Sequence, residues 1–443
     1  MAEPTAARTV VALELLADPR TYERGVPYEL LARLRREPGV VRVPEPALLG
    51  LPEGPGHWLG LRHADVQRVL RDPRRFSSWL GATQVRDPAT PADLEYVRRM
   101  MLNMDPPEHS RLRRLLHRSF TPRAVAALEE QIAGHARSIV DSLLSIEDVV
   151  DFAVVAGDLP LLALADVLGM PTADRGLLFD WSNRVIGFQD PDYAASSRYA
   201  GGTPMAAEAL RLRPEPGPDG RLPDPRTRAG IPDLYAYAHL LAEHKRRSPG
   251  DDVMSILLSE VDDDGGRVSV AEFENLFWLF AVAGNETLRN GIPGGMVALL
   301  AHPDAQRALR ADGTLLPSAV EEMLRWWTPV MVFRRTATEP VTVAGTDIGA
   351  GEKVVVSFAA ANRDETVFAD PDRFDVRRRP NDHLVFGYGP HFCLGAHLAR
   401  AQLRALFGEL FRRTRWIEAA GEPVLLRSSF QRGVKHLPVR LLR

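Results

Sequence analysis

The sequence has very little cysteine, no long uncharged apolar stretch and no excess of charge of one sign. Cys393 is the single cysteine among 443 residues, which excludes an internal disulfide and fits a reducing compartment. No stretch reaches the roughly 18 apolar residues that a membrane helix requires. The segment Met1–Arg8 lacks the basic-then-apolar pattern of a signal peptide. These absences predict a soluble, cytoplasmic protein without a membrane span.

The charge and composition are those of an ordinary globular protein. Lys and Arg number 55 and Asp and Glu number 58, so the formal charge of −3 gives no reason to expect a nucleic-acid partner. Hydrophobic residues make up 45% and charged residues 26%, which is enough for one large core or for two to three smaller domains. Because no linker divides the chain, we expect a single domain over residues 1–443, with residues 1–9 mobile.

Spacings of three and four between apolar residues predict a mainly α protein with a small β-sheet region. The clearest helices are predicted at Pro27–Glu37, Pro122–Leu144, Ala271–Ala301, Pro317–Trp327 and Ala396–Arg413. Strands are predicted at Val40–Val43, Trp58–Leu61, Phe333–Thr338, Val341–Val343 and Val354–Phe358. Inside the long helix Ala271–Ala301, Pro293 is expected to cause a kink, because proline cannot donate to the carbonyl of Arg289.

The segment Arg211–Pro232 differs from the rest because it contains six prolines. We expect it to be an exposed, mobile loop, since this density of proline excludes a helix. A plain surface insertion and a functional lid over bound ligand both remain open for it.

The segment Phe386–Gly395 places the lone cysteine in a glycine-rich turn. Glycines at 387, 389 and 395 surround Cys393, and the helix Ala396–Arg413 follows directly. Glycines allow the backbone to approach a flat ligand closely, and a helix N-terminus favours the thiolate form of a cysteine. A thiolate is a strong iron ligand. The alternative is an inert buried cysteine, which is the usual state of a lone cysteine.

This segment resembles the haem-binding loop of the cytochrome P450 family, and similar motifs follow the family's order from about Leu61 to Leu442. The resemblance implies the cytochrome P450 fold, with a haem b between the long distal helix and the helix after the cysteine. It implies that Cys393 is the iron ligand and that Phe386, Gly387 and Gly395 frame the haem. Several motifs, including Met101–Asp105 and Phe430–Lys435, look like those of bacterial enzymes that oxidise methyl-branched lipids and steroids.

The run Ala283–Gly284–Asn285–Glu286–Thr287 is the oxygen-activation stretch in this resemblance. Gly284 leaves room for a planar cofactor and O2, and the Thr287 hydroxyl can bond to a preceding carbonyl. Glu286 is the candidate proton donor. The family commonly has a second Thr at the position of Leu288. A solvated Glu and a satisfied Thr on an amphipathic helix are the structural alternative.

Two further groups of residues match the family. His109, Arg113, Arg335 and His391 are predicted to hold the haem propionates, and the pair His109 and Arg113 shares one helix face. Glu322 and Arg325 are predicted to form a structural brace with Arg373 that supports the cysteine loop. An isolated cation or a surface ion pair is the ordinary alternative at each of these positions.

The predicted activity is insertion of one oxygen atom from O2 into an unactivated C–H bond of a hydrophobic small molecule. Candidate pocket residues are Val282, Ala283, Val330, Met331, Val332 and Phe333, with part of Ser78–Leu94. Because no glycine-rich dinucleotide fingerprint is present, we expect no bound flavin or NAD. Electrons are expected from a separate ferredoxin and its reductase, docked near Arg111, Arg114 and Arg118.

Three other functions remain open on the sequence. We call Glu286 and Thr287 the acid–alcohol pair. A haem-thiolate enzyme that uses peroxide or isomerises its substrate often lacks such a pair, and a non-catalytic haem sensor does not need one. A cysteine hydrolase would require Cys393 as nucleophile and His391 as base, which lie only two residues apart at a helix start.

Overall fold

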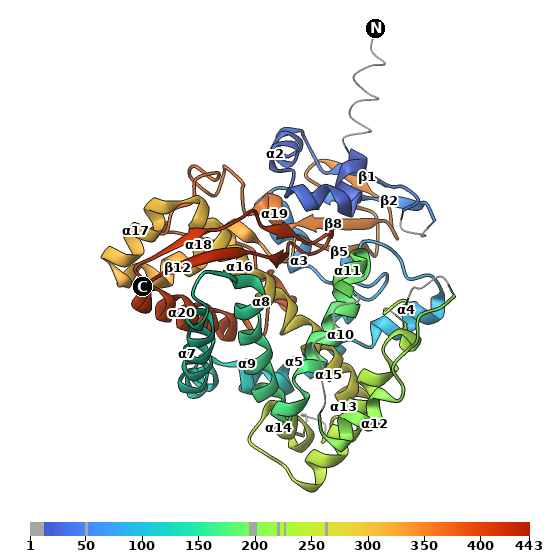
Figure 1. Cartoon of the computed structure of the whole chain (residues 1–443). Helices are drawn as coiled ribbons and strands as arrows, with labels where there is room; N and C mark the ends of the chain where they lie inside the picture. Colours follow the sequence, from blue (N-terminus) through green and yellow to red (C-terminus); the bar gives the residue numbers. More distant parts are fainter. Residues whose placement is uncertain (1–12, 49–51, 195–201, 219–221, 226, 262–264) are drawn as a thin grey trace.

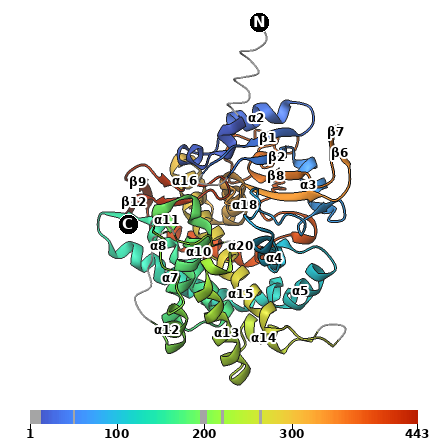
Figure 2. The same cartoon turned by 90° about the vertical axis from the view of Figure 1, so that its right-hand side faces the viewer.

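The computed structural model describes residues 13–48, 52–194, 202–218, 222–225, 227–261 and 265–443, and this part of the chain is mainly helical (Figure 1). The mobile end expected at residues 1–9 lies outside the described residues, as do residues 219–221 and 226 of the proline-rich segment. A five-stranded sheet lies beside the N-terminal helix, and most helices gather on the other side of the molecule (Figures 1 and 2). This arrangement confirms the predicted fold class.

Three of the predicted helices, Pro27–Glu37, Pro317–Trp327 and Ala396–Arg413, agree with helices of the structure to within one residue at each end. The α-helices are α2 (Tyr28–Arg36), α3 (His63–Arg71), α4 (Pro91–Arg98), α5 (Glu108–His117), α6 (Pro122–Ala127), α7 (Glu129–Ser145), α8 (Phe152–Ala156), α9 (Asp158–Leu168), α10 (Gly176–Ile186), α11 (Pro191–Ala194), α12 (Pro204–Leu210), α13 (Pro232–Arg247), α14 (Val253–Ser259), α15 (Val270–Ala283), α16 (Glu286–Ala301), α17 (Pro303–Ala311), α18 (Leu316–Trp327), α19 (Phe358–Ala361) and α20 (Ala396–Arg413).

The main sheet has the order β1-β2-β8-β5-β3. Its strands are β1 (Val41–Glu45), β2 (Gly54–Gly60), β3 (Phe76–Ser77), β5 (Val332–Ala337) and β8 (Lys353–Ser357). β2 and β8 run parallel, and the other pairs are antiparallel. β8 is buried along its whole length, so β5 beside it is held at a fixed position next to the helices.

Smaller strand groups complete the fold. One sheet has the order β4-β12-β9, and two pairs are β6 with β7 and β10 with β11. Their bounds are β4 (Val149–Asp151), β6 (Val341–Val343), β7 (Thr346–Ile348), β9 (Trp416–Ala419), β10 (Val424–Leu425), β11 (Val434–His436) and β12 (Pro438–Leu442).

Two of the predicted long helices are interrupted. The predicted helix Pro122–Leu144 is divided at Leu128 into α6 and α7. The predicted helix Ala271–Ala301 is divided at Gly284 and Asn285 into α15 and α16, while Pro293 lies inside α16. A Cβ on Gly284 would lie 2.8 Å from the Phe280 carbonyl oxygen and 2.9 Å from Leu164 Cδ1. Glycine at 284 therefore permits both the break and the close approach of α9.

The glycine pair after Pro293 has a packing role. A Cβ on Gly294 would lie 2.2 Å from the indole ring of Trp327, so the absence of a side chain lets α18 lie against α16. α18 in turn contacts α20, and α20 contacts α7. The helix that follows Cys393 is thus fixed by packing on both sides.

The two ends of the proline-rich segment are attached to the helical body. Arg213 Nη2 donates to Asp180 Oδ1 at 3.0 Å. Gly230 is buried, and α13 begins at Pro232. Leu212 is 55% exposed, and residues 215–218 are exposed as well, whereas Pro225 is buried.

Candidate active site

A cavity of about 260 Å³ lies between α15, α16 and the segment that carries Cys393, and we call it the cysteine cavity. Many of the predicted site residues line it although they come from four separate parts of the chain. They are His109, Arg113, Ala283, Gly284, Thr287, Val330, Phe333, Arg335, Phe386, Gly387, His391, Cys393 and Gly395. The remaining wall is largely apolar and includes Phe120, Leu164, Leu279, Phe280 and Leu398.

The cysteine loop adopts the tight turn that its glycines predict. Gly387 and Gly389 have φ angles of 72° and 71°, a region that favours glycine. A Cβ on Gly389 would lie 2.5 Å from the Leu70 carbonyl oxygen. The Cys393 N–H donates to the Phe386 carbonyl at 2.8 Å and closes the loop. α20 begins at Ala396, so the sulfur lies three residues before the helix rather than at its first residue.

The exposed surface of Cys393 faces the cysteine cavity. Burial by the surrounding protein raises the pKa of the Cys393 thiol, while the Gly395 N–H and the charges of Arg113 and Arg400 lower it. Burial is the larger effect, contrary to the expectation that the helix start favours the thiolate. A cation bound to the sulfur would favour the thiolate over the thiol.

Four basic side chains meet at one edge of the cavity. The rings of His109 and His391 are 4.0 Å apart. Burial, together with the charges of Arg113 and Arg335, lowers the pKa of His109 to about 4, and the same three effects hold the pKa of His391 well below its ordinary value. Burial also lowers the pKa of Arg335 to about 10. These shifts show that positive charge is crowded and desolvated at this edge.

Among the described residues, a single carboxylate has a marked electrostatic effect on His109 and Arg335 of this basic cluster. Asp105 is the carboxylate that raises the pKa values of His109 and Arg335. Asp105 Oδ1 accepts from the Ser78 N–H at 2.8 Å, so the carboxylate is also used to hold the neighbouring turn. His109 Nδ1 is buried without a hydrogen-bond partner in the described part of the chain. The cluster therefore fits a ligand that brings its own carboxylates, as a haem does.

The acid–alcohol pair is divided between the cavity and the protein interior. The Thr287 hydroxyl faces the cysteine cavity and donates to the Ala283 carbonyl at 3.0 Å. Glu286 is fully buried outside the cavity lining. Its carboxylate accepts from the Tyr193 hydroxyl, from Asn290 Nδ2 at 3.0 Å and from Arg289 Nη1 at 3.3 Å. Adjacent residues on a helix point about 100° apart, which explains the separation.

The structural brace contains a different arginine from the one predicted. Glu322 and Arg325 are fully buried, with Arg325 Nε and Nη2 donating to the carboxylate at 2.8 and 2.7 Å. The third side chain is Arg378, whose Nε donates to Glu322 Oε2 at 3.1 Å. The prediction of Arg373 is wrong, because the turn at Asp370–Arg373 exposes its side chain and directs only its carbonyl to Arg325 and Arg378.

Three of the predicted pocket residues lie outside the cysteine cavity. Met331 and Val332 line a second cavity on the other side of β5, and Val282 is buried in the helical core. Val330 and Phe333 line the cysteine cavity, whereas the two residues between them do not. Within β5, which begins at Val332, successive side chains point to opposite faces, so Phe333 and Arg335 share the face of the cysteine cavity and Val332 does not. Within the segment Ser78–Leu94, part of which is predicted to line the substrate pocket, the residues Gln84, Val85 and Arg86 also line the second cavity.

Sequence reasoning missed several residues that hold the site. Tyr193 has no motif that marks it, whereas Asn290 lies four residues after Glu286 and thus on the same helix face. Glu321 accepts from Arg400 Nε and Nη2, both at 2.7 Å, and the Arg400 guanidinium lies 4.4 Å from the centre of the Phe386 ring. This second ion pair connects α18 to α20 and supports the cysteine loop at Phe386.

The contacts of His391 give no support to a cysteine hydrolase. Its ring lies against His109, and its Nε2 is 3.3 Å from the Ser78 hydroxyl.

Among the helices of the described residues, none has the length and apolar character that a membrane-spanning helix needs.

Comparison with known proteins gives consistent matches. The profile of the family "Cytochrome P450" matches residues 236–438. The chain is 39% identical to the methyl-branched lipid omega-hydroxylase of Mycobacterium tuberculosis, over 92% of this chain and 89% of that protein. It is 35% identical to the steroid C26-monooxygenase of Rhodococcus jostii, over 95% and 83% of the two chains.

Solved structures agree with this. A Mycobacterium marinum cytochrome P450 in complex with pseudoionone superposes with a TM-score of 0.82 and 38% identity, over 95% of this chain and 96% of that one. A Novosphingobium aromaticivorans cytochrome P450 also gives a TM-score of 0.82, at 29% identity over 98% of each chain. With a lone cysteine facing a cavity, a basic cluster that requires carboxylates and relatives along nearly its whole length, the chain belongs to the cytochrome P450 family of monooxygenases.

Proposed function

We propose that this chain binds haem b and hydroxylates an unactivated C–H bond near the end of an elongated, hydrophobic lipid or steroid molecule. The observation that carries the proposal is the juxtaposition, around one cavity, of Cys393, the basic cluster and Thr287. When bound, a haem iron ligated by a thiolate would activate O2, and one of the two oxygen atoms of O2 would enter the substrate.

The chain's own residues would hold the haem at two places. Cys393 would ligate the iron, with the loop of Gly387 and Gly389 keeping the backbone close. His109, Arg113, Arg335 and His391 would bind the two propionates, which relieves the crowding of positive charge. Conversely, the propionates would raise the pKa values of both histidines.

Thr287 and Glu286 would manage the protons. The Thr287 hydroxyl is the polar group of α16 that faces the cavity, where it can donate to oxygen and receive a proton in turn. Glu286 would supply protons to Thr287 from outside the cavity, where its carboxylate accepts hydrogen bonds from Tyr193, Asn290 and Arg289. An acid kept outside the cavity leaves the substrate side apolar.

The substrate class rests on the cavity wall and on the relatives. Phe120, Leu164, Leu279, Phe280 and Phe333 present apolar surface to the cavity, which favours a hydrophobic molecule. One relative is named for hydroxylation at the omega end of a methyl-branched lipid and another for a steroid. We extend both classes to this chain.

Electrons would come from a separate ferredoxin and its reductase. Arg118 is exposed at the end of α5, with Glu260 3.7 Å away, and Arg111 pairs with Glu272. These acidic neighbours weaken the positive field of the predicted docking face.

The decisive test is spectroscopic. The protein is purified with haem supplied, reduced, and exposed to carbon monoxide. A red-shifted Soret band of thiolate ligation is expected, and it should be absent from Cys393→Ser. Folded, haem-loaded protein without that band would refute the proposal. A sensor or peroxide-using enzyme would pass this test but would fail to convert a hydrophobic substrate with O2 and a surrogate ferredoxin.

A further inference from the structure

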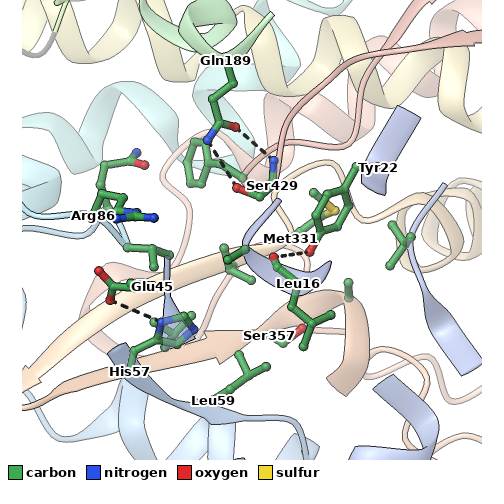
Figure 3. A pocket seen from close by; sticks show the side chains of 18 of the residues that line it. Leu16, Tyr22, Glu45, His57, Leu59, Arg86, Gln189, Met331, Ser357 and Ser429 are labelled. Atoms are coloured by element: carbon green, nitrogen blue, oxygen red, sulfur yellow. Dashed lines mark hydrogen bonds and ion pairs between the residues drawn. The ribbon is translucent and has the colours of Figure 1, made fainter. Parts of the chain in front are cut away.

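A second cavity, of about 90 Å³, lies beside the β1–β2 hairpin, and we call it the hairpin cavity (Figure 3). Apolar side chains such as Leu16, Leu59 and Phe430 form much of its wall. Glu45 and His57 lie together on one side of it, from β1 and β2 (Figure 3). A polar pair in an otherwise largely apolar wall is the pattern of a site that orients a ligand.

His57 is the informative residue of this cavity. It is 6% exposed, and its Nδ1 makes no hydrogen bond within the described part of the chain. Nδ1 lies 3.5 Å from Glu45 Oε1, without the geometry of a hydrogen bond. Burial lowers the pKa of His57, so the neutral ring offers one donor and one acceptor at pH 7. Buried polar atoms are normally paired.

The charges around His57 select against an anionic partner. Glu45 accepts from Lys353 Nζ at 2.9 and 3.1 Å. Burial opposes ionisation of Glu45, but Lys353 and His57 together lower its pKa, so the carboxylate is charged. Arg86, a cation of the same cavity, donates to the carbonyls of Pro52 and Pro46. A ligand carboxylate beside His57 would face the charge of Glu45, whereas a hydroxyl or keto oxygen would not.

The hairpin cavity and the cysteine cavity are separated by one layer of side chains. Phe333 lines the cysteine cavity, Phe430 lines the hairpin cavity, and their ring centres are 5.6 Å apart. Around them, Val330 and Met331 are neighbours in the chain but line different cavities. A long molecule that reaches from Cys393 toward His57 past these two rings would have to displace this aromatic pair.

We propose that the hairpin cavity binds the hydroxyl or keto group at the far end of the substrate, with His57 as the hydrogen-bonding residue and the Phe333–Phe430 pair as the partition. The inference rests on the proposed function, because it concerns the end of the substrate that is not oxidised. It narrows the substrate class to elongated molecules with a neutral oxygen at the end opposite the hydroxylated carbon.

Three probes that differ only at one end test this inference. They are 2-methylhexadecane, 15-methylhexadecan-1-ol and 15-methylhexadecanoic acid, titrated into ferric holoenzyme while the Soret shift is followed. The alcohol should bind roughly 10-fold more tightly than the alkane, the contribution of one well-placed hydrogen bond. His57→Leu should abolish this ratio, and His57→Asn, which places an amide near the position of Nδ1, should keep most of it.

The controls separate this inference from the proposed function. His239→Leu, at an exposed position of α13, should leave the ratio unchanged. Phe430→Ala should strengthen binding of the alcohol relative to a chain too short to reach the partition, such as 2-methyloctane.

Three outcomes would overturn the inference while the thiolate spectrum stays intact. They are an unchanged ratio in His57→Leu, no binding of the alcohol, and tightest binding of the acid with loss in Arg86→Ala. Loss of the thiolate spectrum itself would instead refute the proposed function.

Discussion

Thr287 is the polar side chain of α16 that faces the cysteine cavity, so its hydroxyl is the group best placed to guide protons there. Thr287→Ala should reduce the product formed per electron pair by roughly 10- to 100-fold, because a positioned proton donor is lost. Electron consumption should continue, with peroxide released. The measurement is product and peroxide per electron pair in a reconstituted assay.

Thr287→Ser is the matched control, since it keeps the hydroxyl. Coupling near the native value is expected for it. Unchanged coupling in Thr287→Ala would instead favour the peroxide-using or isomerising alternative.

The pair Glu286 and Thr287 illustrates what adjacent residues in a motif do not reveal. The sequence correctly indicates which residue types stand next to each other, but it does not show that Glu286 points into a network with Tyr193. Tyr193 lies 93 positions away and has no motif of its own. Its place depends on how α11 packs, which is a property of the folded chain.

Glu321 connects α18 and α20 beneath the cysteine loop and supplies a pH prediction. Burial opposes its ionisation, but hydrogen bonds and charges from His383 and Arg400 lower the pKa of Glu321 to about 2. Because the folded pKa lies below the ordinary value of 4.5, the stabilisation is present above pH 4.5 and is lost as the pH falls toward 2. The difference between the ordinary and the folded pKa of Glu321 corresponds to a contribution of about 3 kcal/mol at most to the free energy of unfolding.

Glu321→Gln should remove that part of the acid sensitivity. Denaturant unfolding at pH 7 and at pH 4 would measure it: the gap in stability between native protein and variant should shrink as the pH falls. A gap that stays constant over this range would contradict the assignment. Glu418→Gln, at an exposed position of β9, serves as the control.

The brace on α18 gives a second prediction with a control within the same loop. Arg378→Ala removes charged hydrogen bonds to the buried Glu322 carboxylate, and should lower the free energy of unfolding by about 2 kcal/mol. Arg373→Ala should change it by less than about 0.5 kcal/mol, because that side chain is exposed. Urea unfolding of both variants is the measurement, and the reverse order of effects would show that Arg373 is the third brace residue after all.

The predicted ferredoxin face is a property of the whole surface. Changing Arg111, Arg114 and Arg118 to Glu should slow reduction by the ferredoxin about 10-fold or more at low salt, and less at high salt, because long-range charge steers association. Stopped-flow reduction at two ionic strengths measures this. Arg20→Glu, at an exposed position near the sheet, should have no effect. A rate independent of the three charges would move the docking site elsewhere.

The second cavity shows the limit of sequence reasoning for the molecule as a whole. The sequence predicts Met331 and Val332 in the substrate pocket, yet they line the hairpin cavity. The residues that make this cavity, such as Leu16, His57, Gln189 and Ser429, are spread from one end of the chain to the other. No local pattern connects them.

The amino-acid sequence by itself determined the helical class, the helix ends at Ala396 and Trp327, and the identity of Cys393, Thr287 and the four basic residues. Those features depend on local backbone preferences and on residue types at short spacing, which a linear sequence carries directly. The tertiary structure decided which arginine reaches Glu322, where the Glu286 carboxylate points and which side of β5 faces which cavity. Such choices are made by packing between distant segments, and the free energy of packing is defined only when the whole chain has folded.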